Sequence, residues 1–145
     1  FNRMDAVLSP DFVFYFDPNN VGDYVGDYII PVSWTKTEMM SAVRNMFNLA
    51  YSINLEIPIL TQGEDAFGKP DEGDTTFTKT NVTVDLLLMV DEYNGFQVTG
   101  FCDFEFTKDG SGNWPITIWW DRTASALLTK DIPIPSLGKI FALFY

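Results

Sequence analysis

Apolar and polar residues follow two different periods along the chain, and the points where the period changes are easy to locate. In residues 1–8 and 36–51 the apolar positions recur three and four residues apart, which predicts two amphipathic helices. Helices followed by a run of consecutive long strands indicate an α+β fold with an antiparallel sheet. Strands are predicted where the period is two, over residues 12–16, 24–32, 53–60, 76–91, 96–107 and 114–121.

The second predicted helix has the clearest start signal in the chain. Thr35 and Glu38 have the spacing of a capping box, so we expect Thr35 to be the N-cap. Methionines at helical spacing are typical of a packed core, so we assign no cofactor role to the apolar face of this helix. That face consists of Met39, Val43, Met46, Phe47 and Ala50.

Polar segments rich in glycine separate the later strands. Asn94-Gly95 predicts a type I′ turn between two strands, and residues 109–113 predict another hairpin turn. Residues 61–74 predict a solvated loop. The acids of this loop lack the one-three-five spacing of a calcium-binding loop, so no metal site is predicted.

The charge and composition of the chain exclude several classes of function. Nine basic residues against 20 acidic ones give a formal net charge of −11, which argues against nucleic acid and anionic membrane surfaces as partners. There is no histidine, which excludes histidine-based acid–base catalysis and histidine-containing zinc sites. The one cysteine, Cys102, lies in an apolar alternating run and is predicted to be buried and unreactive. No cofactor is predicted.

The two ends of the chain carry separate expectations. The sequence starts with Phe1 rather than Met, so we expect that a preceding segment has been removed, which leaves cytoplasmic and exported locations both open. No apolar stretch approaches the roughly 18 residues that span a bilayer, so no membrane span is predicted. Residues 1–123 are expected to form one domain, and residues 124–145 a tail whose apolar end packs against this domain or a neighbour.

Two motifs resemble the nuclear transport factor 2-like superfamily, which includes ketosteroid isomerases and polyketide-cyclase-like proteins. LSPDFVFYFDP (8–18) is similar to the family's second helix running into its first strand, and FCDFEFTKDGSGNWPITIWWD (101–121) is similar to its last hairpin. The resemblance covers the chain to about residue 122. It implies a strongly curved antiparallel sheet wrapped around helices, a cone with a pocket. The family's opening helix is missing or truncated here.

The resemblance also implies two working carboxylates. In ketosteroid isomerases an Asp-Pro at the end of the first strand supplies the general base, and Asp17-Pro18 stands in that place. An Asp in a D-x-F-x-F run before the last turn stays protonated and donates a hydrogen bond to an oxyanion, and Asp103 matches that position. The tyrosine of the isomerases belongs to the helix that this chain lacks.

Strand parity leaves a structural alternative open for both acids. If Phe104, Phe106 and Trp120 face the core, then Asp103 faces water, and alternation does not choose between the faces because both are rich in aromatic residues. Asp17 can equally be an ordinary turn residue, since Asp-Pro commonly ends a strand.

Three hypotheses about function follow. The leading one is a domain that binds an apolar small molecule, neutral or cationic, or that serves in a protein assembly, without catalysis. The second is an isomerase, cyclase or lyase with Asp17 as base and Asp103 as oxyanion donor. The third is a structural module that forms a homodimer through its sheet. The pocket is expected between helix 36–51 and the concave sheet, lined by Tyr15, Asp17, Phe101, Asp103, Trp119 and Asp121.

Overall fold

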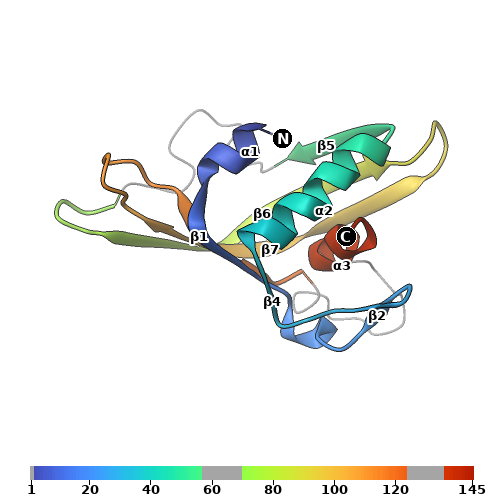
Figure 1. Cartoon of the computed structure of the whole chain (residues 1–145), viewed down its shortest axis with the longest axis horizontal. Coiled ribbons are helices and arrows are strands. Elements are labelled where there is room, and N and C mark those ends of the chain that lie inside the picture. The colour runs from blue at the N-terminus through green and yellow to red at the C-terminus, as the bar shows by residue number, and fades with distance from the viewer. Residues whose placement is uncertain (1, 57–69, 124–135) are drawn as a thin grey trace.

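The computed structural model of the protein describes residues 2–56, 70–123 and 136–145, which form an α+β fold as predicted (Figure 1). This part of the chain contains a six-stranded sheet, a two-stranded ribbon and three α-helices. None of the helices found in it is both long enough and apolar enough to cross a membrane. The predicted strand end at 57–60, most of the predicted loop 61–74 and the tail residues 124–135 lie outside the described residues.

The six-stranded sheet has the strand order β4–β1–β8–β7–β6–β5. β1 and β8 are parallel and the other neighbours are antiparallel, so the prediction of a wholly antiparallel sheet is wrong. A parallel pair needs a long connection, and here most of the chain supplies it. The strands are β1 (Leu8–Tyr15), β4 (Ser33–Thr35), β5 (Ser52–Glu56), β6 (Thr76–Met89), β7 (Gly95–Thr107) and β8 (Ile116–Asp121).

The segment predicted as one strand over 24–32 is broken into a small ribbon. Its two strands are β2 (Tyr24–Val25) and β3 (Tyr28–Ile29), and β4 follows them. Gly26 lies between the two strands with a φ of 60°, a left-handed conformation that glycine adopts without a Cβ clash. The chain therefore reverses where the alternating pattern alone predicts a continuous strand.

Three helices cover one face of the sheet: α1 (Asn2–Val7), α2 (Lys36–Leu49) and α3 (Leu137–Leu143). In Figure 1, α2 is seen in front of the long strands β6 and β7 and runs in nearly the same direction as they do. It begins after Thr35, the predicted N-cap, and the capping box with Glu38 is present. The Glu38 Oε2 atom accepts hydrogen bonds from the Thr35 N–H at 2.7 Å and from the Thr35 hydroxyl at 3.0 Å.

The face of the sheet under the helices, which we call the inner face, carries the core. Val82, Val84, Leu86 and Leu88 of β6 are all buried, as strand alternation requires. Phe14 of β1 is fully buried at the centre of an aromatic cluster. Its ring centroid lies 5.0 Å from that of Phe16, 6.3 Å from Trp34, 5.7 Å from Trp119 and 5.8 Å from Phe141.

Two bulges interrupt the alternation of the long strands. Lys79 pairs with Phe104 and Val82 with Cys102, so β6 has one extra residue at this point. Asn81 lies in that bulge with a φ of 56°. In β8 the extra residue is Thr117, because Ile118 pairs with Glu105 whereas Ile116 pairs with Phe106.

The β6–β7 turn differs from the predicted type I′ turn. That turn needs positive φ at both central residues, and neither Asn94 nor Gly95 has one. Instead, Asp91 Oδ1 accepts hydrogen bonds from the N–H groups of Tyr93 and Asn94, both at 2.8 Å. The carboxylate of Asp91 therefore closes a wider turn than the Asn-Gly pair indicates.

The described end of the tail, residues 136–145, packs against the rest of the fold. Leu137, Ile140 and Phe141 of α3 are buried in the same core as the sheet. The Asn45 side chain of α2 donates a hydrogen bond to the Phe144 carbonyl at 2.8 Å. This segment is consequently a structural part of the domain.

Candidate functional site: an apolar cavity under the sheet

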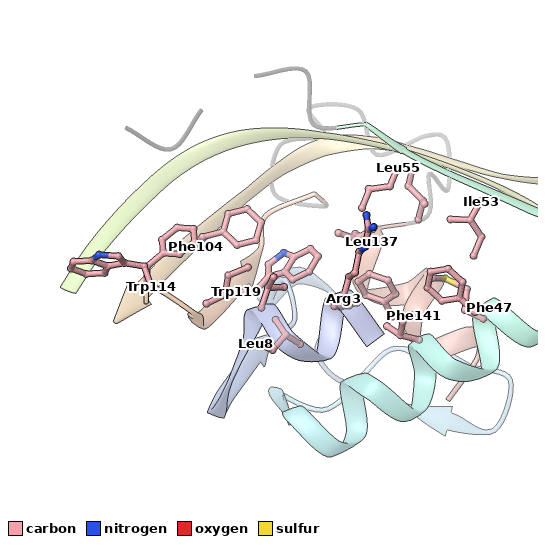
Figure 2. Close-up of a pocket in the computed structure, with 17 residues that line it drawn as sticks. Arg3, Leu8, Phe47, Ile53, Leu55, Phe104, Trp114, Trp119, Leu137 and Phe141 are labelled. Atoms are coloured by element: carbon pink, nitrogen blue, oxygen red, sulfur yellow. The ribbon is translucent and has the colours of Figure 1, made fainter. Parts of the chain in front are cut away.

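A cavity of about 600 Å³ lies between the inner face of the sheet and the three helices. Figure 2 shows the labelled side chains meeting in a space over which the long strands curve. In the part of the chain that the structure describes, 17 residues line it, and all but one of them are apolar. They are Arg3, Met4, Val7, Leu8, Val43, Met46, Phe47, Ile53, Leu55, Leu86, Phe104, Phe106, Trp114, Ile116, Trp119, Leu137 and Phe141.

The sheet supplies the aromatic wall of the cavity. Phe104 of β7 is paired across the sheet with Trp119 of β8, and their ring centroids are 5.0 Å apart. The bulge at Thr117 adds Ile116 to this wall, although Ile116 and Trp119 are three positions apart. Regular alternation would point two such residues to opposite faces, so the bulge enlarges the apolar surface of the cavity.

The lining residues divide into a floor and a rim. Eight of them form the floor, with at most 7% of each residue exposed: Leu8, Val43, Met46, Leu86, Phe104, Trp119, Leu137 and Phe141. Four others are exposed: Arg3 and Val7 of α1, Phe47 of α2 and Leu55 of β5. The described lining therefore combines a buried apolar floor with exposed rim residues on α1, α2 and the edge strand β5.

Of the six residues predicted to line one pocket, Trp119 lines this cavity. Tyr15, Phe101 and Asp103 lie on the opposite side of the sheet, which we call the outer face. Tyr15 stacks on Trp120 there, with ring centroids 6.1 Å apart, and Phe101 is 40% exposed. The prediction grouped these residues by odd number, but the register pairs even-numbered Cys102 with odd-numbered Asp121, so equal parity does not give an equal face.

Asp103 is engaged in contacts of the outer face. Its Oδ2 atom forms a salt bridge with Arg122 Nε at 3.2 Å, and its Oδ1 atom accepts a hydrogen bond from the Asn81 N–H at 2.9 Å. Both oxygens are therefore acceptors, whereas the predicted oxyanion role requires a carboxyl group that donates. Asp103 also satisfies the backbone of the β6 bulge, which is a structural task.

Asp17 and Asp121 lie together, away from the lining of the cavity. We call this cluster of Asp17, Asp121, Thr123 and Gly138 the acid corner. Both carboxylates are fully buried, and the charge of Asp17 adds to the rise in the pKa of Asp121. Asp17 Oδ1 accepts a hydrogen bond from the Asn19 N–H at 2.9 Å, at the start of the short 3-10 helix Pro18–Asn20.

Asp121 joins the end of β8 to the start of α3. Its Oδ2 atom accepts a hydrogen bond from the Gly138 N–H at 2.8 Å, and Oδ1 accepts from the Thr123 N–H at 2.9 Å and from the Thr123 hydroxyl. Burial raises the pKa of this carboxyl, while the hydrogen bonds from Thr123 and Gly138 oppose the rise. The structure thus brings Asp17 next to Asp121 and separates it from Asp103.

The remaining candidates for chemistry are the cysteine and a metal-binding group of side chains. Burial raises the pKa of the Cys102 thiol far above its ordinary value, in keeping with the predicted unreactive cysteine. Within residues 2–56, 70–123 and 136–145, no group of three acidic, cysteine or histidine side chains is arranged to hold a metal ion.

Arg3 and most of the apolar lining were not predicted from the sequence. The apolar stripe of α2 contained the available signal, since Val43, Met46 and Phe47 belong both to that stripe and to the cavity. Arg3 carried no such signal, because only the folded chain places it at the rim. Comparisons of the chain with protein-family models, with curated proteins and with solved structures find no match.

Proposed function

We propose that this domain binds an apolar small molecule in the cavity. The observation that carries the proposal is the lining: the floor consists of buried apolar side chains, and among the lining residues that the structure describes Arg3 is the one that carries a charge. Ligand sites in proteins usually have volumes of about 300–1,000 Å³ and mostly apolar walls, and this cavity of about 600 Å³ falls within that range.

The energetics favour a ligand with a flexible or flat hydrocarbon body. Each methylene group moved from water into an apolar site contributes about 0.8 kcal/mol, so a ten-carbon chain gains roughly 8 kcal/mol before the entropic cost of association. Part of that gain is lost on binding, so we expect dissociation constants in the micromolar to millimolar range. Rings of Phe104, Trp119 and Phe141 would contact such a chain.

The test is calorimetric titration of the protein with decan-1-ol, an uncharged probe of about the right length. We expect saturable binding with a negative heat-capacity change, the marker of apolar burial. Leu86→Trp adds bulk to the cavity floor and should weaken binding at least tenfold. Leu87→Trp is the matched control, because Leu87 is the next residue, lies on the outer face and is 41% exposed.

Equal effects of the two tryptophan substitutions would contradict the proposal, and so would an absence of saturable binding. Leu86→Trp can also destabilise the core, since overpacking costs about 1–3 kcal/mol. Thermal unfolding of each variant therefore accompanies the titrations. The binding result counts where the variant remains folded at the temperature of the experiment.

We also propose a relationship to the nuclear transport factor 2-like superfamily. The element order supports it, with a capped helix between the first strand and a run of long antiparallel strands. The location of the cavity, between α2 and the curved sheet, supports it as well (Figure 2). The two carboxylates of the isomerase hypothesis are not part of this proposal, because Asp17 and Asp103 do not line the cavity.

A homodimer through the sheet is a second candidate, favoured by apolar residues on the outer face. Leu87 is 41% exposed and Phe101 is 40% exposed on neighbouring strands of that face. Contact with a second copy would remove both from water. Sedimentation at micromolar concentration tests this proposal: a mass near twice 16.5 kDa supports the dimer, and a mass of 16.5 kDa contradicts it.

A further inference from the structure

Among the described residues at the rim of the cavity, one is charged. Arg3 lies on α1 beside Met4 and Val7, which also line the cavity, and the residue is exposed. In Figure 2 its guanidinium nitrogens reach from α1 toward the side of the space where Leu55 and Leu137 are labelled. A cation therefore stands at the rim, next to a floor whose described residues are all uncharged.

The neighbouring charges of α1 do not neutralise Arg3. Asp5 of the same helix forms a salt bridge with Lys36 Nζ at 3.2 Å, and Lys36 also donates hydrogen bonds to the carbonyls of Asp5 and Leu8. In the described part of the chain Arg3 forms no ion pair. Its guanidinium can thus accept an anionic partner from outside the protein without breaking a salt bridge to any residue that the structure describes.

From this arrangement we infer that the ligand is an amphiphile with an apolar body and an anionic head group, such as a carboxylate. The inference rests on the proposed function and deepens it. The body occupies the floor formed by residues such as Leu86, Phe104 and Trp119, and the head group stays at the rim, where Arg3 binds it and water still reaches it. Guanidinium is well suited to this task, since its planar donors match both oxygens of a carboxylate.

The net negative charge of the protein repels anions, and this limits how much Arg3 can improve the affinity for a carboxylate. A net charge of −11 repels an anion at long range, but at physiological ionic strength such repulsion is screened beyond roughly 8 Å. Arg3 acts at contact distance. An exposed ion pair is weak, so we expect Arg3 to improve carboxylate binding about threefold to tenfold rather than by orders of magnitude.

The principal alternative is that Arg3 covers the rim with its aliphatic stem, as long charged side chains often do. That role would serve charged and uncharged ligands equally. The two roles are separated by a cycle that combines a change of head group with a change of residue: decanoate and decan-1-ol have the same carbon chain, and Arg3→Gln removes the charge while it keeps a polar side chain of similar kind.

The experiment measures the affinity of both probes by tryptophan fluorescence, because two of the four tryptophans, Trp114 and Trp119, line the cavity. Arg3→Gln should weaken decanoate binding about threefold to tenfold and change decan-1-ol binding less than twofold. Arg3→Glu should weaken decanoate further. Arg122→Gln is the matched control, because it removes one positive charge from the outer face and should leave both affinities within a factor of two.

Each outcome is decisive. An equal change for both probes in Arg3→Gln, or no change for decanoate, overturns the inference while decan-1-ol binding to the wild-type protein leaves the proposed function standing. Failure of the wild-type protein to bind either probe overturns both. Equal weakening of decanoate by Arg3→Gln and Arg122→Gln also overturns the inference, because the effect would then come from net charge alone.

Discussion

The cavity and the acid corner lie on the same side of the sheet, yet they use buried space in opposite ways. The cavity has aromatic and aliphatic walls around about 600 Å³ of space, whereas in the acid corner Asp121 accepts hydrogen bonds from Thr123 and Gly138. The sequence patterns made acidic residues the candidates for function. Here the acids hold the end of the fold together, and the apolar region has the capacity to bind.

Helix α3 connects the two regions. Leu137 and Phe141 line the cavity, while Gly138, between them, donates its N–H to Asp121. We therefore expect substitutions on the cavity side of this helix to alter packing and binding. Substitutions on the side of the acid corner should instead alter the attachment of the helix to the rest of the fold.

The largest effect is expected from Phe141→Ala on the cavity side. Phe141 is buried, and its ring centroid lies 5.8 Å from that of Phe14 and 5.9 Å from that of Trp119. Loss of the ring should lower the free energy of unfolding by about 3 kcal/mol, measured by urea denaturation. Leu143→Ala on the same helix is the control, since Leu143 is 48% exposed and should cost less than about 1 kcal/mol. Similar losses in both variants would show that α3 is not a wall of the core.

Gly138→Ala is expected to have the next largest effect and to act on the acid corner. A Cβ at this position would lie 2.7 Å from Phe16 Cδ1 and 3.0 Å from Asp121 Oδ2, so the helix would have to move away. We expect a loss of about 2 kcal/mol in the free energy of unfolding. Gly110→Ala is the matched control because nothing lies within 4 Å of its Cβ. A Gly138→Ala variant as stable as the Gly110→Ala variant would contradict the close approach of α3 to Asp121.

Asp121→Asn should produce a smaller effect that depends on pH. Burial raises the pKa of Asp121 above its ordinary value of 3.8. A carboxyl whose pKa is higher in the folded than in the unfolded state adds stability below about pH 3.8, and that stability is lost as the pH rises through the raised value. Urea denaturation between about pH 3.5 and pH 7 should therefore show the wild-type protein losing stability relative to the variant as the pH increases.

The control for this measurement is Asp91, an acid whose pKa is shifted downward. Hydrogen bonds from the Asn94 side chain and from the N–H groups of Tyr93 and Asn94 lower the pKa of Asp91. Its contribution is present above the ordinary pKa and is lost as the pH falls, so Asp91→Asn should give a difference of opposite slope. If the difference in stability from the wild-type protein changed with pH in the same direction for both variants, the prediction of opposite pKa shifts in the acid corner and at Asp91 would be wrong.

The smallest effect is expected from Arg122→Gln, a substitution on the outer face. It tests whether that face contributes to stability or to ligand binding. The side chains of Arg122 and Asp103 are 38% and 17% exposed, so solvent screens their salt bridge. We expect the free energy of unfolding to change by less than about 1 kcal/mol. Binding of decan-1-ol should not change. A loss of binding would instead make the outer face part of the ligand site.

Local signals predicted much of the fold. The capping box of Thr35 and Glu38 located the start of α2 because its hydrogen bonds join residues only three apart. Alternation located the two longest strands within a few residues of their observed ends. The parallel pairing of β1 with β8 could not be predicted in this way, since the pattern of a single strand does not record the direction of its neighbour.

The candidate site was harder to predict than the fold because it depends on register. Asp103 and Trp119 have the same parity, but the pairing of β7 with β8 turns them to opposite faces. The bulges at Asn81 and Thr117 then change the parity within a strand. An acid after an aromatic run also attracts a catalytic interpretation, although the partners of Asp103 and Asp121 are backbone groups and neighbouring side chains.

The pairing of β1 with β8 also sets an order of events when the chain folds. Phe14 and Trp119 are cross-strand partners about 105 positions apart, whereas Met89 and Gly95 meet across a short turn. Loop-closure entropy favours the β6–β7 hairpin as an early structure and makes the closure of β1 against β8 late. On the ribosome, the phenylalanines of the first strand are made long before β8 exists. Until β8 has been made, the apolar residues of this N-terminal segment lack their partner strand. The protein consequently depends most on protection from aggregation during that period.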